Sequence, residues 1–198
     1  MMTSERDPLR HATIKSVLSH RGELSVSAWH FERRWWVVGS ANNGNLINGV
    51  TDDLDQLLEV IEGWAKGAGL NEIANGVPID ILTGRGEVPD GNLPDVIAAE
   101  WQFMLKESRQ IDWPEYRALI EVAYAEPKIR RLYPYTSHWA LCFSATPYPF
   151  TRSFVTLIAS RDGGYTVRKR LNGPELARVA TPAEAVAMAV ARLPKDLG

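Results

Sequence analysis

Apolar and polar residues alternate along two parts of the chain, and an amphipathic helix pattern follows each part. In the first part, the alternation predicts strands over residues 23–31, 35–40 and 46–50. Asn43-Gly44, between the last two, is typical of a tight hairpin because these residues accept positive φ angles. Together with the helix that follows, this pattern predicts a β-β-β-α unit.

The helix of this first unit is predicted from a cap and an apolar stripe. Thr51 is the expected N-cap, and Asp52 and Asp53 place carboxylates in the first turn, where they meet the positive end of the helix dipole. Residues three and four apart then form one apolar face, which must pack against a sheet. The members of this stripe are Leu54, Leu57, Leu58, Ile61 and Ala65.

The second part repeats the plan near the C-terminus. The pattern predicts extended segments over residues 137–144, 152–160, 165–171 and 175–180. Thr181 then caps a helix, with Pro182 at its first position and Glu184 completing a capping box. We therefore predict an α+β protein made of two small antiparallel sheet-plus-helix units, a β-β-β-α pseudo-repeat that resembles a duplication.

A helical middle segment joins the two units. Residues 84–94 contain three glycines and two prolines and predict a flexible loop, which makes them the expected domain boundary. The predicted domains are therefore an N-terminal unit over residues 1–83, and residues 95–198, in which helices precede the second unit. Apolar spacing predicts those helices over 95–110 and 112–125.

The net charge of −2 hides an uneven distribution. Residues 1–127 contain 11 Lys and Arg against 20 Asp and Glu, whereas residues 128–198 contain 11 against 4. The basic region is expected to attract anionic ligands, although the two regions also attract each other. The pI of about 6.1 and the absence of a basic helix argue against a nucleic-acid partner.

Composition sets further expectations. We expect a cytoplasmic protein with no membrane partner, because no charged leader precedes an apolar run and no segment approaches 18 apolar residues. Cys142 is the single cysteine and sits in a strand pattern, so it is expected to be packed in the core. No metal or cofactor is expected, because the histidines lack ligand spacing and no glycine-rich phosphate loop is present.

The richest chemistry lies in residues 130–139, RRLYPYTSHW. His138 is the candidate for proton transfer, because imidazole changes charge near neutral pH, with Tyr135 and Tyr133 as further catalytic candidates. Arginines supply paired N–H donors for a carboxylate or phosphate. The alternative is that these side chains serve packing and neutralise acidic neighbours. The candidate substrate-binding residues are Arg130, Arg131, Ser137, Arg152, Arg168, Arg170 and Trp35.

Trp35 and Trp36 are adjacent on a predicted strand, so one ring points to each face of the sheet. An exposed ring beside Arg33 and Arg34 would form a peptide-docking surface. A dimer contact, or a cover for the helix stripe that contains Trp64, remains an equal alternative.

Three segments resemble an actinobacterial domain-of-unknown-function family, number 6193, that is associated with natural product biosynthesis. They are DDLDQLLEVIEGWAKG at 52–67, LIEVAYAEPKIRRLYPYTSHWALCFS at 119–144 with YPFTR after it, and TPAEAVAMAVARLP at 181–194. The resemblance implies a small cytoplasmic bacterial protein of a pathway that makes a ribosomal-peptide-type product. It implies no reaction, cofactor or catalytic residue.

Three hypotheses about function follow. The first is a cofactor-free tailoring enzyme or enzyme subunit that catalyses a cyclisation or elimination step on a peptide intermediate, using His138 and a tyrosine. The second is a non-catalytic binding module that presents an acidic precursor peptide or a partner enzyme to the pathway. The third is a self-protection protein. The sequence leaves the substrate and the oligomeric state open.

Overall fold

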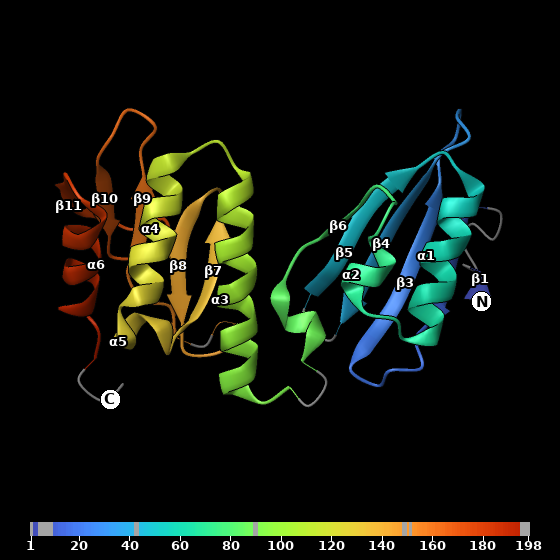
Figure 1. Cartoon of the computed structure of the whole chain (residues 1–198), viewed down its shortest axis with the longest axis horizontal. Coiled ribbons are helices and arrows are strands. Elements are labelled where there is room, and N and C mark those ends of the chain that lie inside the picture. Colours follow the sequence, from blue (N-terminus) through green and yellow to red (C-terminus); the bar gives the residue numbers. More distant parts are fainter. Residues whose placement is uncertain are drawn as a thin grey trace. The chain divides into compact units, whose positions relative to one another are not determined.

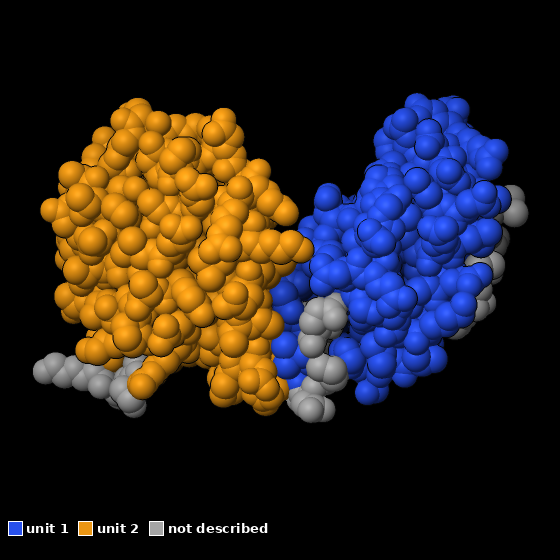
Figure 2. Space-filling model, in the orientation of Figure 1, with its two compact units in different colours: residues 1–91 blue, residues 92–198 orange. Residues whose placement is uncertain are grey.

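The chain forms two compact units, Met1–Gly91 and Asn92–Gly198 (Figure 2). The computed structural model describes residues 2–3, 10–41, 44–88, 91–147, 150 and 152–194. Each unit contains one antiparallel sheet and its own helices (Figure 1). The predicted α+β class is therefore confirmed.

The sheet of the first unit is a six-stranded antiparallel meander, in which spatial order follows sequence order. The predicted strands correspond to β3, β4 and β5, and β4 and β5 join as a hairpin with Ala41 opposite Gly44. Asn43 of the predicted turn lies outside the described residues. The strands are β1 (Met2–Thr3), β2 (His11–Lys15), β3 (Arg21–Ala28), β4 (Trp35–Ala41), β5 (Gly44–Thr51) and β6 (Ile79–Ile81).

The first helix, α1 (Leu54–Lys66), begins two residues later than predicted. Asp53 is its N-cap and accepts hydrogen bonds from the backbone N–H groups of Asp55 and Gln56. The prediction that Thr51 caps this helix is wrong, because Thr51 ends β5 and its hydroxyl instead donates to the Gln56 side chain over 2.8 Å. Two shorter helical segments follow, α2 (Leu70–Ile73) and the 3-10 turn η1 (Gly84–Glu87).

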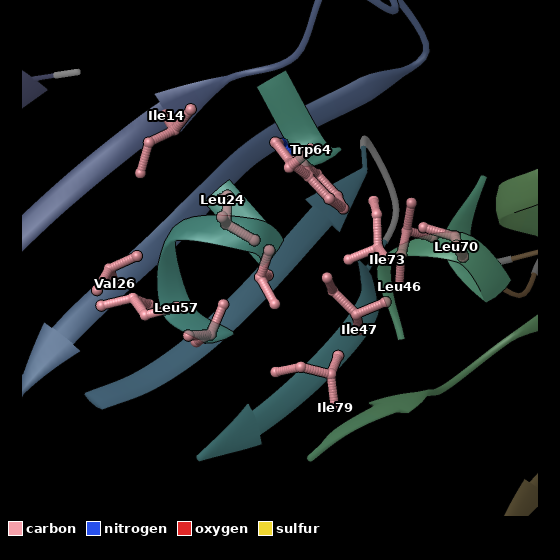
Figure 3. Packing of buried hydrophobic residues seen from close by; sticks show 12 residues of the cluster. Ile14, Leu24, Val26, Leu46, Ile47, Leu57, Trp64, Leu70, Ile73 and Ile79 are labelled. Carbon is pink, nitrogen blue, oxygen red and sulfur yellow. The ribbon is translucent and has the colours of Figure 1, made fainter. Parts of the chain in front are cut away.

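The buried face of α1 also differs from the predicted stripe. Leu57, Val60 and Trp64 are buried, whereas Leu54 and Leu58 are exposed. Figure 3 shows Leu57 and Trp64 pointing from α1 towards side chains of the strands. The largest apolar residue of the helix thus sets which face packs on the sheet.

The packing around Trp64 depends on a residue without a side chain. A Cβ atom at Gly39, on β4, would lie 2.4 Å from the Trp64 ring and 2.6 Å from Ile47. Such distances are below van der Waals contact, so any larger residue would force this core apart. Gly39 therefore permits the close approach of α1 to the sheet.

The second unit places helices before its strands as well as after them. Its five-stranded antiparallel sheet has the order β11-β10-β9-β8-β7. The helices are α3 (Leu93–Gln110), α4 (Pro114–Ala125), α5 (Pro127–Arg130) and α6 (Pro182–Val190), and the strands are β7 (Tyr133–Ser137), β8 (Ala140–Ser144), β9 (Thr156–Ala159), β10 (Tyr165–Arg168) and β11 (Glu175–Val179).

The predicted start of the last helix is confirmed in detail. Thr181 caps α6, its hydroxyl accepts from the Glu184 backbone N–H, and the Glu184 side chain accepts from the Thr181 backbone. The carboxylate of Glu184 has a lowered pKa, mainly because of its hydrogen bond with the Thr181 side chain.

One face of the second sheet packs against helices. The Phe143 ring lies 6.2 Å from the ring of Trp101 on α3, and the Trp101 indole N–H donates to the Leu132 carbonyl over 3.1 Å. Leu141 pairs with Leu157, and both are fully buried. Because strand side chains alternate, Tyr135 and Cys142 belong to the opposite face.

Candidate functional site

The segment with the densest chemistry forms a strand and a turn. Tyr133, Tyr135 and Ser137 alternate along β7 and therefore share one face of the second sheet. Tyr133 is buried, whereas Tyr135 and Ser137 are partly exposed. These residues thus belong to a regular strand at the edge of the sheet.

His138 lies in the two-residue turn between β7 and β8, with Ser137 paired to Ala140. Both turn residues are left-handed, with φ of 50° at His138 and 64° at Trp139. This conformation suits the tight turns that Asn-Gly usually forms, and costs about 1–2 kcal/mol for a bulky L-residue. The imidazole is exposed, and its Nδ1 lies 3.3 Å from the Ser137 hydroxyl.

Tyr135 has its own set of contacts. Its ring stacks on Phe150, with centroids 3.9 Å apart, and its hydroxyl lies 3.4 Å from that of Ser153. Burial raises the pKa of Tyr135, an effect that the Ser153 hydrogen bond partly opposes. Tyr135 is therefore a neutral hydroxyl donor at physiological pH.

A row of side chains crosses the helix-free face of the second sheet from Tyr135. Cys142 pairs with Tyr135, its thiol lies 3.5 Å from the Thr156 hydroxyl, and Thr156 pairs with Arg168. Burial raises the pKa of the Cys142 thiol. Since strands lie about 4.8 Å apart, the backbones of Tyr135 and Arg168 are separated by roughly 14 Å. Cys142 and Thr156, in the middle of the row, are buried, whereas Tyr135 and Arg168 at its two ends are partly exposed.

The predicted arginines do not form one cluster. Arg130 lies over the Tyr124 ring, 5.6 Å from its centroid, while Arg131 is exposed just after α5. Arg168 is partly buried on β10, and its Nε atom is buried without a hydrogen-bond partner among the described residues. Arg152 and Arg170 are exposed, the latter in the turn after β10. Within the second unit, only Arg168 shares the sheet row with Tyr135.

The connection from β3 to β4 presents aromatic and basic side chains in the first unit. Phe31 is 98% exposed and Trp29 is 47% exposed. On β4, Trp36 is 48% exposed on the helix-free face, whereas Trp35 lies on the helix-facing side and is partly buried. We call Trp29, Phe31 and Trp36, with Arg33 and Arg34, the aromatic tip.

Each arginine of the aromatic tip lies over a tryptophan ring, Arg34 over Trp29 of the tip and Arg33 over the neighbouring Trp35. Arg34 lies 5.0 Å from the ring centroid of Trp29, and Arg33 lies 5.7 Å from that of Trp35. Arg34 also forms an exposed ion pair with Glu32 over 3.3 Å, which contributes little in water. Cation–π contacts of this kind order aromatic side chains before a ligand arrives.

A second aromatic group was missed by the sequence reasoning. Trp139 contacts Trp113 and Tyr116, at the start of α4, with centroid distances of 6.3 and 5.6 Å. The sequence carried no signal for this group, because residues 137–144 were predicted as one extended segment. The structure corrects this prediction, since His138 and Trp139 form the turn between β7 and β8.

Comparison with known proteins identifies a family for the second unit. The model of the family of unknown function DUF6193 matches residues 95–198, which is more than half of the chain. The chain belongs to this family. The DUF6193 match leaves out residues 52–67, so it is narrower than the resemblance drawn from the three segments. No curated protein and no solved structure matches the chain.

Two further observations bear on the class of site. Among the residues that the structure describes, no three His, Cys, Asp or Glu side chains are grouped so as to hold a metal ion. None of the described helices combines the length and the apolarity that crossing a bilayer requires.

Proposed function

We propose that this DUF6193 protein is a non-catalytic module that binds an acidic peptide, either a precursor peptide or a segment of a partner enzyme. The observation that supports this most is the aromatic tip, where Trp29 and Phe31 are exposed beside arginines. Trp and Arg dominate the binding energy of protein interfaces. Arg33 is exposed and Arg34 is partly exposed, and their charges complement acidic side chains.

The second sheet supports binding more than catalysis. Tyr135 and Cys142 both have raised pKa values because of burial, so neither is activated as a base or nucleophile. His138 is exposed in its turn, and its hydrogen bond among the described residues is to the adjacent Ser137. The partly exposed Tyr135 hydroxyl and the Arg168 guanidinium are instead groups that bind a carboxylate.

We further propose that the module works in the bacterial cytoplasm, in a pathway that modifies a ribosomal-peptide-type natural product. The resemblance of this chain to a family associated with natural product biosynthesis supports this pathway. Pathways of this type need proteins that hold a precursor peptide while other enzymes act on it.

The test selects ligands without assuming one. A random pool of 12-residue peptides is panned on the full chain, and enriched peptides are measured by fluorescence anisotropy. We expect enrichment in Asp and Glu, and binding that weakens as salt rises from about 50 to 500 mM. Enriched peptides without acidic residues, or affinity insensitive to salt, would contradict the proposal.

Variants then locate the surface. Trp29→Ala combined with Phe31→Ala is expected to weaken binding by roughly 30-fold or more, as for interface hot spots. Leu58→Ala is the matched control, because Leu58 is 47% exposed in the same unit but lies on α1. Binding that survives in the double variant, with fold intact by circular dichroism, would move the site elsewhere.

A second candidate function, a cofactor-free enzyme for cyclisation or elimination, is favoured by one observation. His138 and Trp139 hold strained left-handed conformations, and such strain often occurs at active sites. In that case His138→Ala lowers turnover of the pathway intermediate by about 100-fold while peptide binding persists. A binding module keeps supporting its pathway with this substitution.

A further inference from the structure

The end of the second unit that carries the β7–β8 turn also carries an aromatic surface. Trp113 precedes α4, Tyr116 lies in its first turn, and Trp139 reaches them from the β7–β8 turn. Trp139 meets the Tyr116 ring edge-on at 86°, and Trp113 lies 5.6 Å from Tyr116. Tyr116 is fully buried, whereas Trp139 remains 46% exposed. One indole of the surface is thus fixed by packing and open to solvent.

A guanidinium of the chain already occupies part of this aromatic surface. The Arg161 side chain lies 4.7 Å from the ring centroid of Trp113 and donates to the Asp112 carbonyl over 3.2 Å. This contact shows that the rings attract a cation at their faces, as the ring quadrupole requires. Trp139 has a comparable face and, among the described residues, no cation over it.

A carboxylate on α3 acts electrostatically on Tyr116, the buried ring of this group. Glu107, on α3, is partly buried, and burial raises the pKa of its carboxyl group. Burial and, to a smaller extent, the charge of Glu107 raise the pKa of Tyr116, whose buried hydroxyl has no hydrogen-bond partner among the described residues. No ion pair with Glu107 occurs in the described part of the chain. A positive charge brought close to Glu107 would favour the ionised form of its carboxyl group.

We infer that Trp139 binds the guanidinium of an arginine side chain from a partner peptide. The conformation of the turn supports this assignment. Asn-Gly would form the turn without strain, so the bulky indole at a left-handed position is retained at a cost. Arg161 on Trp113 is the intramolecular example of the same contact. The site does not depend on the acidic-peptide surface and has the opposite charge preference.

The experiment uses the full chain labelled with ¹⁵N and follows the indole N–H signals of the tryptophans. Nα-acetyl-arginine methylamide is titrated against the citrulline compound, which has the same shape without the charge. We expect a saturable shift of the Trp139 signal, with the citrulline compound binding roughly 3- to 30-fold more weakly. Equal affinities, or no saturable shift at Trp139, would overturn the inference.

Variants separate recognition from folding. The variants of Trp139 lack its indole signal, so their binding is followed through the signal of the neighbouring Trp113. Trp139→Leu should abolish the saturable binding, and Trp139→Phe, which keeps a ring, should restore part of it. Glu107→Gln should weaken binding several-fold, and Arg161→Ala should strengthen it, because a competing charge leaves the surface. Leu58→Ala, at an exposed position of the other unit, is the control and should bind as the original chain does. Retained affinity in Trp139→Leu, or weakened affinity in Arg161→Ala, would refute the site.

Discussion

The two connections that expose tryptophans are built on opposite principles. The β3–β4 connection places Phe31 almost entirely in solvent and holds Trp29 only by the guanidinium of Arg34. The β7–β8 turn is two residues long, and its Trp139 packs on the rings of Trp113 and Tyr116. The first presents rings that the fold does not need, whereas the second presents a ring that is also part of the packing.

Because of this difference, the rings of the β3–β4 connection are expected to affect binding alone, whereas Trp139 is expected to affect both binding and the stability of the fold. Exposed aromatic side chains without buried partners contribute little to folding, so their cost to solubility is best explained by a binding partner. A ring that packs on a buried tyrosine contributes to both, and its variants need a readout that folding does not affect. The two units are therefore expected to respond differently to the same kind of substitution.

The largest expected effect lies beneath the helix of the first unit. Gly39→Ala adds a methyl group at 2.4 Å from the Trp64 ring. We expect a loss of about 3 kcal/mol in the free energy of unfolding of this unit, because overpacking a tight core forces shifts in the backbone. Urea unfolding followed by circular dichroism measures it.

Ser25→Ala is the control for this substitution. Ser25 is exposed on β3, so its replacement should change stability by less than about 0.5 kcal/mol. A Gly39→Ala chain as stable as the original would mean that α1 does not lie as close to β4 as described. Trp29→Ala and Phe31→Ala should resemble the control in stability, whatever they do to binding.

The next effect concerns Tyr116, beneath the turn of the second unit. Its buried hydroxyl has no hydrogen-bond partner among the described residues, so Tyr116→Phe should be neutral or stabilise the fold by about 1 kcal/mol. Because the folded-state pKa of Tyr116 is raised above the usual 10.0, its protonated form stabilises the fold below pH 10, and this contribution is lost as pH rises further. Tyr116→Phe should therefore lose less stability than the original chain between pH 8 and 11.

Tyr124→Phe supplies the comparison. The Tyr124 hydroxyl accepts a hydrogen bond from Gln102 over 3.1 Å, so its removal should cost about 0.5–1 kcal/mol. Urea unfolding at both pH values distinguishes the two tyrosines. An equal alkaline loss in Tyr116→Phe and the original chain would show that Tyr116 is ionised without penalty in the fold.

Alternation and caps were sufficient to predict the α+β class, the strands β3, β4 and β5, and the capped start of α6. These local patterns did not predict features that depend on tertiary packing. Only Ile14 is buried in β2, so the alternation of this strand was too weak to recognise. The buried face of α1 includes Trp64 and differs from the face predicted from the spacing of the leucines. The residues of the candidate site could not be grouped from the sequence, because contacts between distant segments, such as Trp113 with Trp139, bring them together.

The smallest expected effect tests whether the left-handed conformation of His138 in the β7–β8 turn destabilises the second unit. His138→Asn replaces an exposed left-handed residue with one that tolerates this conformation, so it should stabilise the second unit by about 0.5 kcal/mol. Lys128→Asn, at an exposed position of α5, should give no such gain. If His138→Asn instead destabilises the unit, a contact of the imidazole outweighs the strain of the turn, and His138 contributes to packing together with Trp139. If His138→Asn stabilises the unit and leaves peptide binding unchanged, His138 serves neither folding nor binding. That outcome favours a role in proton transfer.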